Sequence, residues 1–192
     1  MIAFLHGGSP GRDFEFYRNV VDFKNVEVKV AIIPFATKDR NLWSDIERYF
    51  ISMLTYVNPN HVFTTVGVDN RNFDSVDLMF VPGGNGDILK CEVEKRSIFS
   101  REVFFKKDVV YVGNSAGVNL LSKLYYSNDN KRIDQGLGLH NVATFCHYSA
   151  DKYRRLNELV VAAQMHGIKE IIPLGDDEYI DKEVLWYSRL DC

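Results

Sequence analysis

A serine between two glycines is the feature of the sequence best suited to chemistry. Gly113, Ser115 and Gly117 lie in "YVGNSAGVNLL" and have the G-x-S-x-G pattern. A short apolar run precedes this pattern and an apolar helical run follows it, so the chain should turn sharply from a strand into a helix at the serine. Such a turn, a nucleophile elbow, exposes the hydroxyl at the carboxyl end of a sheet. The pattern therefore predicts Ser115 as a nucleophile.

A serine hydroxyl is a weak nucleophile until a base takes its proton, and a carboxylate usually orients that base. His147 follows an apolar run and precedes a loop, a position from which a strand end can direct an imidazole into a cleft. His140, in the same segment, is the alternative base. The candidate carboxylates are Asp129 and Asp134, which both lie in a polar segment after the elbow helix.

Short apolar runs that alternate with amphipathic segments predict the elements that position these residues. Strands are expected within 2–8, 26–36, 61–68, 76–85, 108–113, 169–175 and 184–190, and helices within 13–23, 41–57, 87–107 and 150–167. Strands that are apolar on both faces and separated by helices are typical of a parallel sheet covered on both sides. The sequence predicts an α/β fold that forms one domain over residues 1–192.

Composition and charge exclude several classes of function. The 192 residues include 23 Lys and Arg and 26 Asp and Glu, giving a net charge of -3, and no run of basic residues suggests binding to nucleic acid. The N-terminal apolar stretch is short and has no basic residue ahead of it, so we expect neither a signal peptide nor a membrane span, and a cytoplasmic location. Three widely spaced cysteines predict reduced thiols rather than disulfides or a zinc site. No metal or cofactor is expected.

Several segments together resemble the peptidase E and cyanophycinase family of serine peptidases. In chain order they are "AIIPFAT", "LMFVPGGNGDILK", "YVGNSAGVNL", "SNDN", "GLGLHNVATFCHY" and "IIPLGDDEYI". The resemblance implies a fold similar to that of class I glutamine amidotransferases, a flavodoxin-like three-layer sandwich with a mostly parallel sheet. It also implies hydrolysis of small peptides, with dipeptides that begin with Asp as the family's typical substrates. We expect a monomer or a homodimer.

The resemblance assigns roles to particular residues. Ser115 would be the nucleophile, His147 the general base and Asp129 the third member of the triad, with Asp134 still open as the acid. The reaction would pass through an acyl-enzyme.

Other residues are expected around this triad. The backbone N–H groups of Gly84 and Ala116 would form the oxyanion hole, and Asn85 and Tyr148 are candidates for substrate binding. The loop "SADKYRR" after the histidine differs from the family pattern, so recognition of an N-terminal Asp does not carry over from it. Two alternatives therefore stay open: another serine amidase or esterase on the same scaffold, or a binding protein without catalysis. Amidotransferase activity is disfavoured because those enzymes have a cysteine at the elbow.

Overall fold

The computed structural model describes residues 2–11, 13–21, 26–66, 76–99 and 109–183. Its main sheet has six strands in the order β10-β1-β5-β4-β2-β3. Their bounds are β1 (Ile2–His6), β2 (Glu27–Ile32), β3 (Val62–Val66), β4 (Leu78–Val81), β5 (Val110–Asn114) and β10 (Tyr179–Glu183). Neighbouring strands are parallel except for β10, which pairs with β1 in the antiparallel direction.

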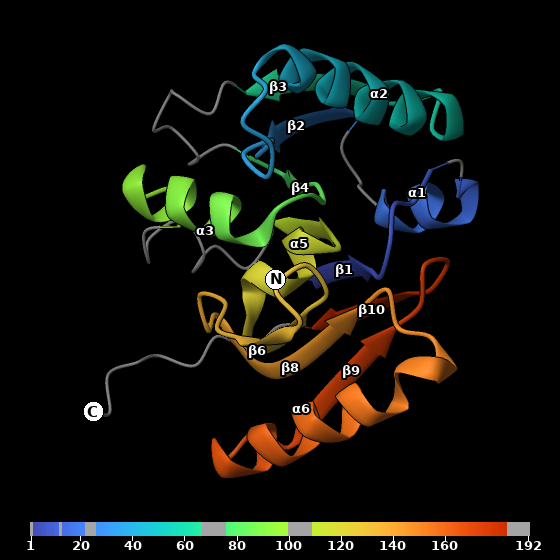
Figure 1. Cartoon of the computed structure of the whole chain (residues 1–192). Coiled ribbons are helices and arrows are strands. Elements are labelled where there is room, and N and C mark those ends of the chain that lie inside the picture. The colour runs from blue at the N-terminus through green and yellow to red at the C-terminus, as the bar shows by residue number, and fades with distance from the viewer. Residues whose placement is uncertain (1, 12, 22–25, 67–75, 100–108, 184–192) are drawn as a thin grey trace.

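Helices cover both faces of the main sheet (Figure 1). On one face, α1 (Phe14–Val20) and α2 (Asn41–Val57) pack against strand residues such as Phe4 and Phe80. On the other face, α3 (Gly86–Lys95) and α5 (Ala116–Leu121) pack against residues such as Leu5. Successive side chains of a strand point to opposite faces, so consecutive apolar residues supply both of these cores.

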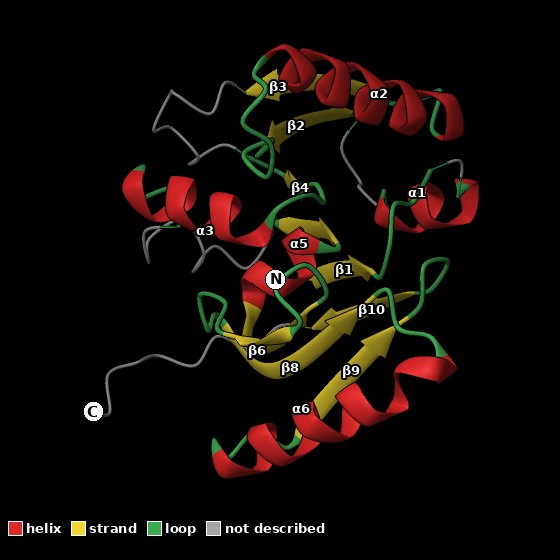
Figure 2. Cartoon of the chain, in the orientation of Figure 1, coloured by secondary structure: helices red, strands yellow, loops and turns green. Residues whose placement is uncertain are grey.

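A second sheet of four strands lies beyond α5. Its order is β7-β6-β8-β9, with bounds β6 (Ser122–Ser127), β7 (Arg132–Asp134), β8 (His140–Cys146) and β9 (Glu170–Leu174). β8 is parallel to both β6 and β9, whereas β7 is antiparallel to β6. The short helix η2 (Ala150–Lys152) leads into α6 (Tyr153–Met165), which covers the outer face of this sheet (Figure 2).

The predicted fold class is confirmed: a mostly parallel sheet carries helices on both faces. The second sheet was not expected, because β6 begins at Ser122 directly after α5, without the turn residues that usually mark a strand. The last strand of the described chain is β10, at 179–183, and the strand expected at 184–190 lies outside the described residues. Of the helix expected at 87–107, the structure describes α3, which ends at Lys95, and residues 100–107 lie outside the described residues. No helix in the described part of the chain is long and apolar enough to cross a membrane.

Candidate active site

The backbone at Ser115 makes the sharp turn from strand to helix that the sequence predicts. β5 ends at Asn114 and α5 begins at Ala116, which leaves Ser115 alone between strand and helix with φ 48° and ψ −105°. A non-glycine residue with positive φ is strained, at a cost of about 1–3 kcal/mol, and such strain is maintained only where the surrounding structure enforces it. Ser115 is half-buried, so its hydroxyl remains accessible.

The two glycines of the elbow are required by close packing. A Cβ on Gly117 would lie 2.0 Å from the carbonyl oxygen of Val81, and one on Gly113 would lie 2.7 Å from the Tyr111 ring. The Tyr111 hydroxyl also donates a hydrogen bond of 2.7 Å to the carbonyl of Gly117. The start of α5 is therefore held directly against β4 and β5, and this contact fixes the position of Ser115.

His147 brings its imidazole to this serine from the end of β8. Its Nε2 lies 2.7 Å from Ser115 Oγ, within hydrogen-bonding distance. The end of β1 holds both residues: the Ser115 N–H donates to the carbonyl of His6 at 3.0 Å, and the His147 N–H donates to that of Gly7 at 3.2 Å. The alternative of a binding protein without catalysis would be favoured by a serine and a histidine too far apart to interact, and this contact weighs against it.

The carboxylate that contacts His147 is Asp176, which is not one of the two acids predicted from the sequence. Its Oδ1 forms a hydrogen bond with His147 Nδ1. The strands that precede the two residues are parallel neighbours, with Cys146 opposite Leu174, so His147 and Asp176 leave the same edge of the second sheet. The segment "IIPLGDDEYI" contributes to the resemblance but assigns no role to Asp176, and the signal that identifies the acid is the pairing of β8 with β9, which is not local in the chain.

Asp129 and Asp134 lie elsewhere. Asp129 lines the pocket beside Ser115, and Asp134 in β7 forms an ion pair with Arg132 at 2.7 Å. The hydrogen bond to His147 Nδ1 comes from Asp176 and from neither of these two acids. His140, the alternative base, is buried at the start of β8, at the opposite end of the strand from His147. Asp176 therefore replaces Asp129 as the acid that contacts the imidazole.

The two glycines after β1, Gly7 and Gly8, lie where the turn that carries Asp176 packs against the end of β1. A Cβ on Gly7 would lie 2.1 Å from the carbonyl oxygen of Gly175, and one on Gly8 would lie 2.6 Å from that of Asp176. The Gly7 N–H also donates to the carbonyl of Glu178 at 2.9 Å. The turn that carries Asp176 can approach β1 only because these two positions have no side chain.

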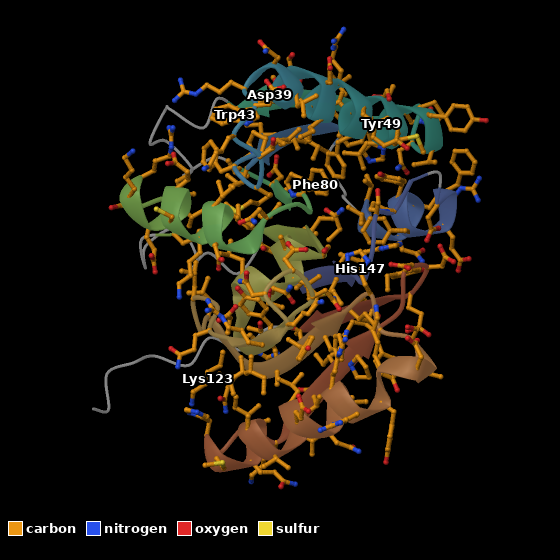
Figure 3. The ribbon with its side chains drawn as sticks, viewed as in Figure 1. Asp39, Trp43, Tyr49, Phe80, Lys123 and His147 are labelled. Carbon is orange, nitrogen blue, oxygen red and sulfur yellow. The ribbon has the colours of Figure 1, made fainter. Side chains whose placement is uncertain are left out.

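Two pockets meet at Ser115. We call the smaller one, of about 290 Å³, the polar pocket; its lining includes Gly84, Asn85, Ala116, Asn119 and Asp129 together with Ser115 and His147. The larger one, of about 500 Å³, is the apolar pocket; it is also lined by Ser115 and His147, and its other members include Tyr17, Ile46, Phe80 and Pro82. Figure 3 shows Phe80 between Tyr49, on α2, and His147. A substrate can extend from the serine in two directions.

The remaining predicted site residues differ in their surroundings. Gly84 has φ 135°, and a Cβ there would lie 2.8 Å from Ala36, so this position requires glycine. The Asn85 side chain accepts a hydrogen bond of 3.0 Å from the Ile88 N–H, which caps α3. Tyr148 packs edge-on against Phe145 and is absent from the described lining of both pockets.

Cys146 and His6 lie beneath the site in a buried environment. Burial raises the pKa of the Cys146 thiol, whose Sγ lies 3.5 Å from the Ser115 carbonyl oxygen, so this thiol stays neutral and packs. Burial also lowers the pKa of His6, although Asp13 at 3.7 Å partly offsets the effect. Among the described residues, no group of three or more His, Cys, Asp or Glu side chains could hold a metal ion.

Comparison with known proteins relates this arrangement to peptidases. The model of peptidase family S51 matches residues 4–183. The structure is similar to that of a peptidase from an acI-B1 Actinobacterium, with a TM-score of 0.66 and 13% identity over 95% of this chain and 83% of that one. It is also similar to a protein assigned as peptidase E from Listeria monocytogenes EGD-e, with a TM-score of 0.60 and 16% identity over 96% and 98% of the two chains. No curated protein gives a significant match to the sequence.

Proposed function

The chain belongs to peptidase family S51 and is a serine-type peptidase, and on this basis we propose that it hydrolyses small peptides through a triad of Ser115, His147 and Asp176. The observation that carries the proposal is the distance of 2.7 Å between Ser115 Oγ and His147 Nε2. A base at this distance can take the hydroxyl proton as the oxygen attacks. The carboxylate on the other ring nitrogen supports the same assignment.

From these contacts we propose a role for each group in the reaction. Asp176 accepts a hydrogen bond from Nδ1–H of His147, which leaves Nε2 free of a proton and facing the serine. Ser115 Oγ attacks the peptide carbonyl while its proton passes to Nε2. His147 then gives that proton to the leaving amine, and an acyl-enzyme forms. A water molecule, deprotonated by the same imidazole, then attacks the acyl carbonyl; the bond to Ser115 Oγ breaks, the imidazolium returns the proton to that oxygen, and the second product leaves as the acid.

The negative charge of the tetrahedral intermediate requires donors that are already in place. We assign this function to the N–H groups of Ala116, the residue after the nucleophile, and Gly84, because both residues line the polar pocket with Ser115. The glycine at position 84 lets the backbone come close, as its packing against Ala36 indicates. The loss of one such donor typically lowers kcat by about 10²–10³.

A preference for an N-terminal Asp, typical of the family that the sequence resembles, is not part of this proposal. The polar pocket carries the carboxylates of Asp87 and Asp129, and the described residues that line it include no Lys or Arg. An aspartate of the substrate would meet like charge there, which disfavours its binding.

A fluorophosphonate probe tests the proposal, because it reacts with an activated serine. We expect the wild-type protein to be labelled at Ser115, and Ser115→Ala to lose both the label and at least about 10⁴-fold of peptide hydrolysis. Ser149→Ala is the matched control, since Ser149 is exposed and contacts Asp151 rather than the imidazole. A folded wild-type protein, verified by circular dichroism, that takes up no label would refute the proposal.

A further inference from the structure

The two pockets at Ser115 differ in charge. The polar pocket contains the acidic side chains of Asp87 and Asp129 and the amides of Asn128 and Asn130. No Lys or Arg lines it among the described residues. Ser115 and His147 lie at the junction of this pocket with the apolar one, so the groups on the two sides of a bound peptide bond would meet different surroundings.

Among the described residues, the two carboxylates of the polar pocket form no ion pair. Asn130 Nδ2 lies 3.0 Å from Asp87 Oδ2 and 3.2 Å from Asp134 Oδ2, and it holds two carboxylates near each other. Arg132 forms an ion pair with Asp134 at 2.7 Å, and Lys90 Nζ donates to the carbonyl of Gln135 at 2.9 Å; neither cation is in the described lining of the pocket. Asp87 and Asp129 therefore remain available to a cation that enters.

The pKa of Tyr125, a residue in the wall of the polar pocket, is shifted by the same negative charge. Its pKa is raised to about 12, first by burial and then by the charges of Asp134 and Asp87, with a smaller contribution from Asp129. Arg132 opposes this shift but does not cancel it. Three carboxylates thus act on one buried phenol that lines the pocket, which is consistent with a negative potential inside it.

The apolar pocket offers different contacts. Tyr17 and Phe80 are buried core residues that also contribute to its wall, together with Pro82. Asp45, the acid that lines this pocket, is already paired with Arg48.

One polar group of this pocket has unfilled hydrogen-bonding capacity. Asn114 is 6% exposed and lines the pocket, and its Oδ1 has no hydrogen-bond partner among the described residues. A buried acceptor without a partner is unfavourable, so this amide is a polar irregularity in an otherwise apolar wall.

We propose that the preferred substrates place a cationic side chain in the polar pocket and an apolar side chain in the apolar pocket, on opposite sides of the bond that Ser115 cleaves. The inference rests on the proposed function. It predicts the charge opposite to that of the aspartyl peptides typical of the resembled family. Both carboxylates are exposed, so water screens their attraction to a cation, and we expect a preference of about threefold to tenfold rather than an absolute requirement. The preference should weaken as ionic strength rises.

Matched dipeptides test this inference. The panel contains Lys-Phe and Phe-Lys, the same peptides with norleucine in place of lysine, and Asp-Phe and Phe-Asp. Norleucine keeps the aliphatic stem of lysine and removes its charge. One of the two lysine peptides should be cleaved with a kcat/KM about threefold to tenfold above that of its norleucine counterpart. Whether this peptide is Lys-Phe or Phe-Lys shows which pocket holds the side chain of the residue that forms the acyl-enzyme.

Variants of the pocket then test whether the preference for lysine comes from Asp87 and Asp129. The double variant Asp87→Asn and Asp129→Asn should bring the ratio of lysine to norleucine peptide close to one. Glu158→Gln, an exposed position on α6 that lines neither pocket, is the control for the loss of a distant negative charge and should leave the ratio unchanged.

The outcomes separate the two proposals. If Ser115 is labelled by the fluorophosphonate but the norleucine or aspartate peptides are cleaved as well as the lysine peptides, the substrate inference is wrong and the serine peptidase mechanism stands. The same holds if Ser115 is labelled and no peptide of the panel is cleaved. If Ser115 is not labelled in the folded protein, the mechanism itself fails.

Discussion

The two sheets contribute to the candidate site by different means. The main sheet supplies Ser115 from an elbow packed so closely that Gly113 and Gly117 have no room for a side chain. The second sheet supplies His147 and Asp176 from loops, where their side chains are 39% and 71% exposed. Packing therefore fixes Ser115, the proposed nucleophile, whereas strand pairing and a few hydrogen bonds position His147 and Asp176, the proposed base and acid. Substitutions of His147 and Asp176 should accordingly lower activity with little effect on stability, whereas substitutions at the glycines around Ser115 should lower stability itself.

The largest effect on activity from the second sheet should come from His147→Ala. It removes the proton acceptor itself, and no other described imidazole is in contact with Ser115, so kcat/KM should fall by about 10⁴-fold. Steady-state hydrolysis measures the loss. His166→Ala, at the exposed end of α6, removes an equivalent ring far from the serine and should keep wild-type activity. Retention of activity in the His147 variant would show that another group acts as the base.

Asp176→Asn should have a smaller effect. The carboxylate is mostly exposed, so water can partly replace its hydrogen bond to His147, and we expect a loss in kcat of about 10²-fold rather than the roughly 10⁴-fold known for a buried acid. Asp177→Asn, the exposed neighbour, is the control. A larger loss of kcat in Asp129→Asn than in Asp176→Asn would restore Asp129, the acid that the sequence favoured.

On the side of the main sheet, Gly117→Ala should reduce stability. The new methyl group would overlap the Val81 carbonyl at 2.0 Å, so the free energy of unfolding should fall by about 1–3 kcal/mol or more. Gly167→Ala is the comparison: Gly167 has φ 67° but open space around it, and only the backbone strain of about 1 kcal/mol remains. Denaturant unfolding of both variants measures the difference. Equal losses would mean that the contact with β4 relaxes easily.

The smallest effect concerns His6, on β1 between the two halves of the site. Burial lowers its pKa in the folded protein below the ordinary 6.5, so the unfolded chain binds more protons just below that pH. Stability should be unaffected by this group above pH 6.5 and should decrease as the pH falls from 6.5 toward the lowered pKa. His6→Gln should flatten this dependence in unfolding experiments between pH 7 and pH 5. An unchanged slope would assign the acid sensitivity to other groups.

The same contrast explains what could be predicted from the sequence. The elbow is local, because the pattern around Ser115 lies between two apolar runs, and the alternation of strands and helices was sufficient to predict the fold class. His147 could be selected because it directly follows its strand. Asp176 could not, since its place beside the imidazole depends on which strand pairs with β8, and no short pattern specifies that. Gly7 and Gly8 were expected only as the end of the strand at 2–8, whereas the structure shows that they allow close approach of the Asp176 turn. The catalytic roles themselves stay predictions.

The pairing of Cys146 with Leu174 also determines where this protein can change its length. The connection between the two strands passes through α6 on the outer face, so residues added to or removed from that crossover leave both strand ends in place. An insertion inside β8 or β9 would instead reverse the side-chain directions beyond it and turn the carboxylate away from the ring. Insertions and deletions in the crossover are therefore compatible with the site. Insertions and deletions within β8 or β9 are not.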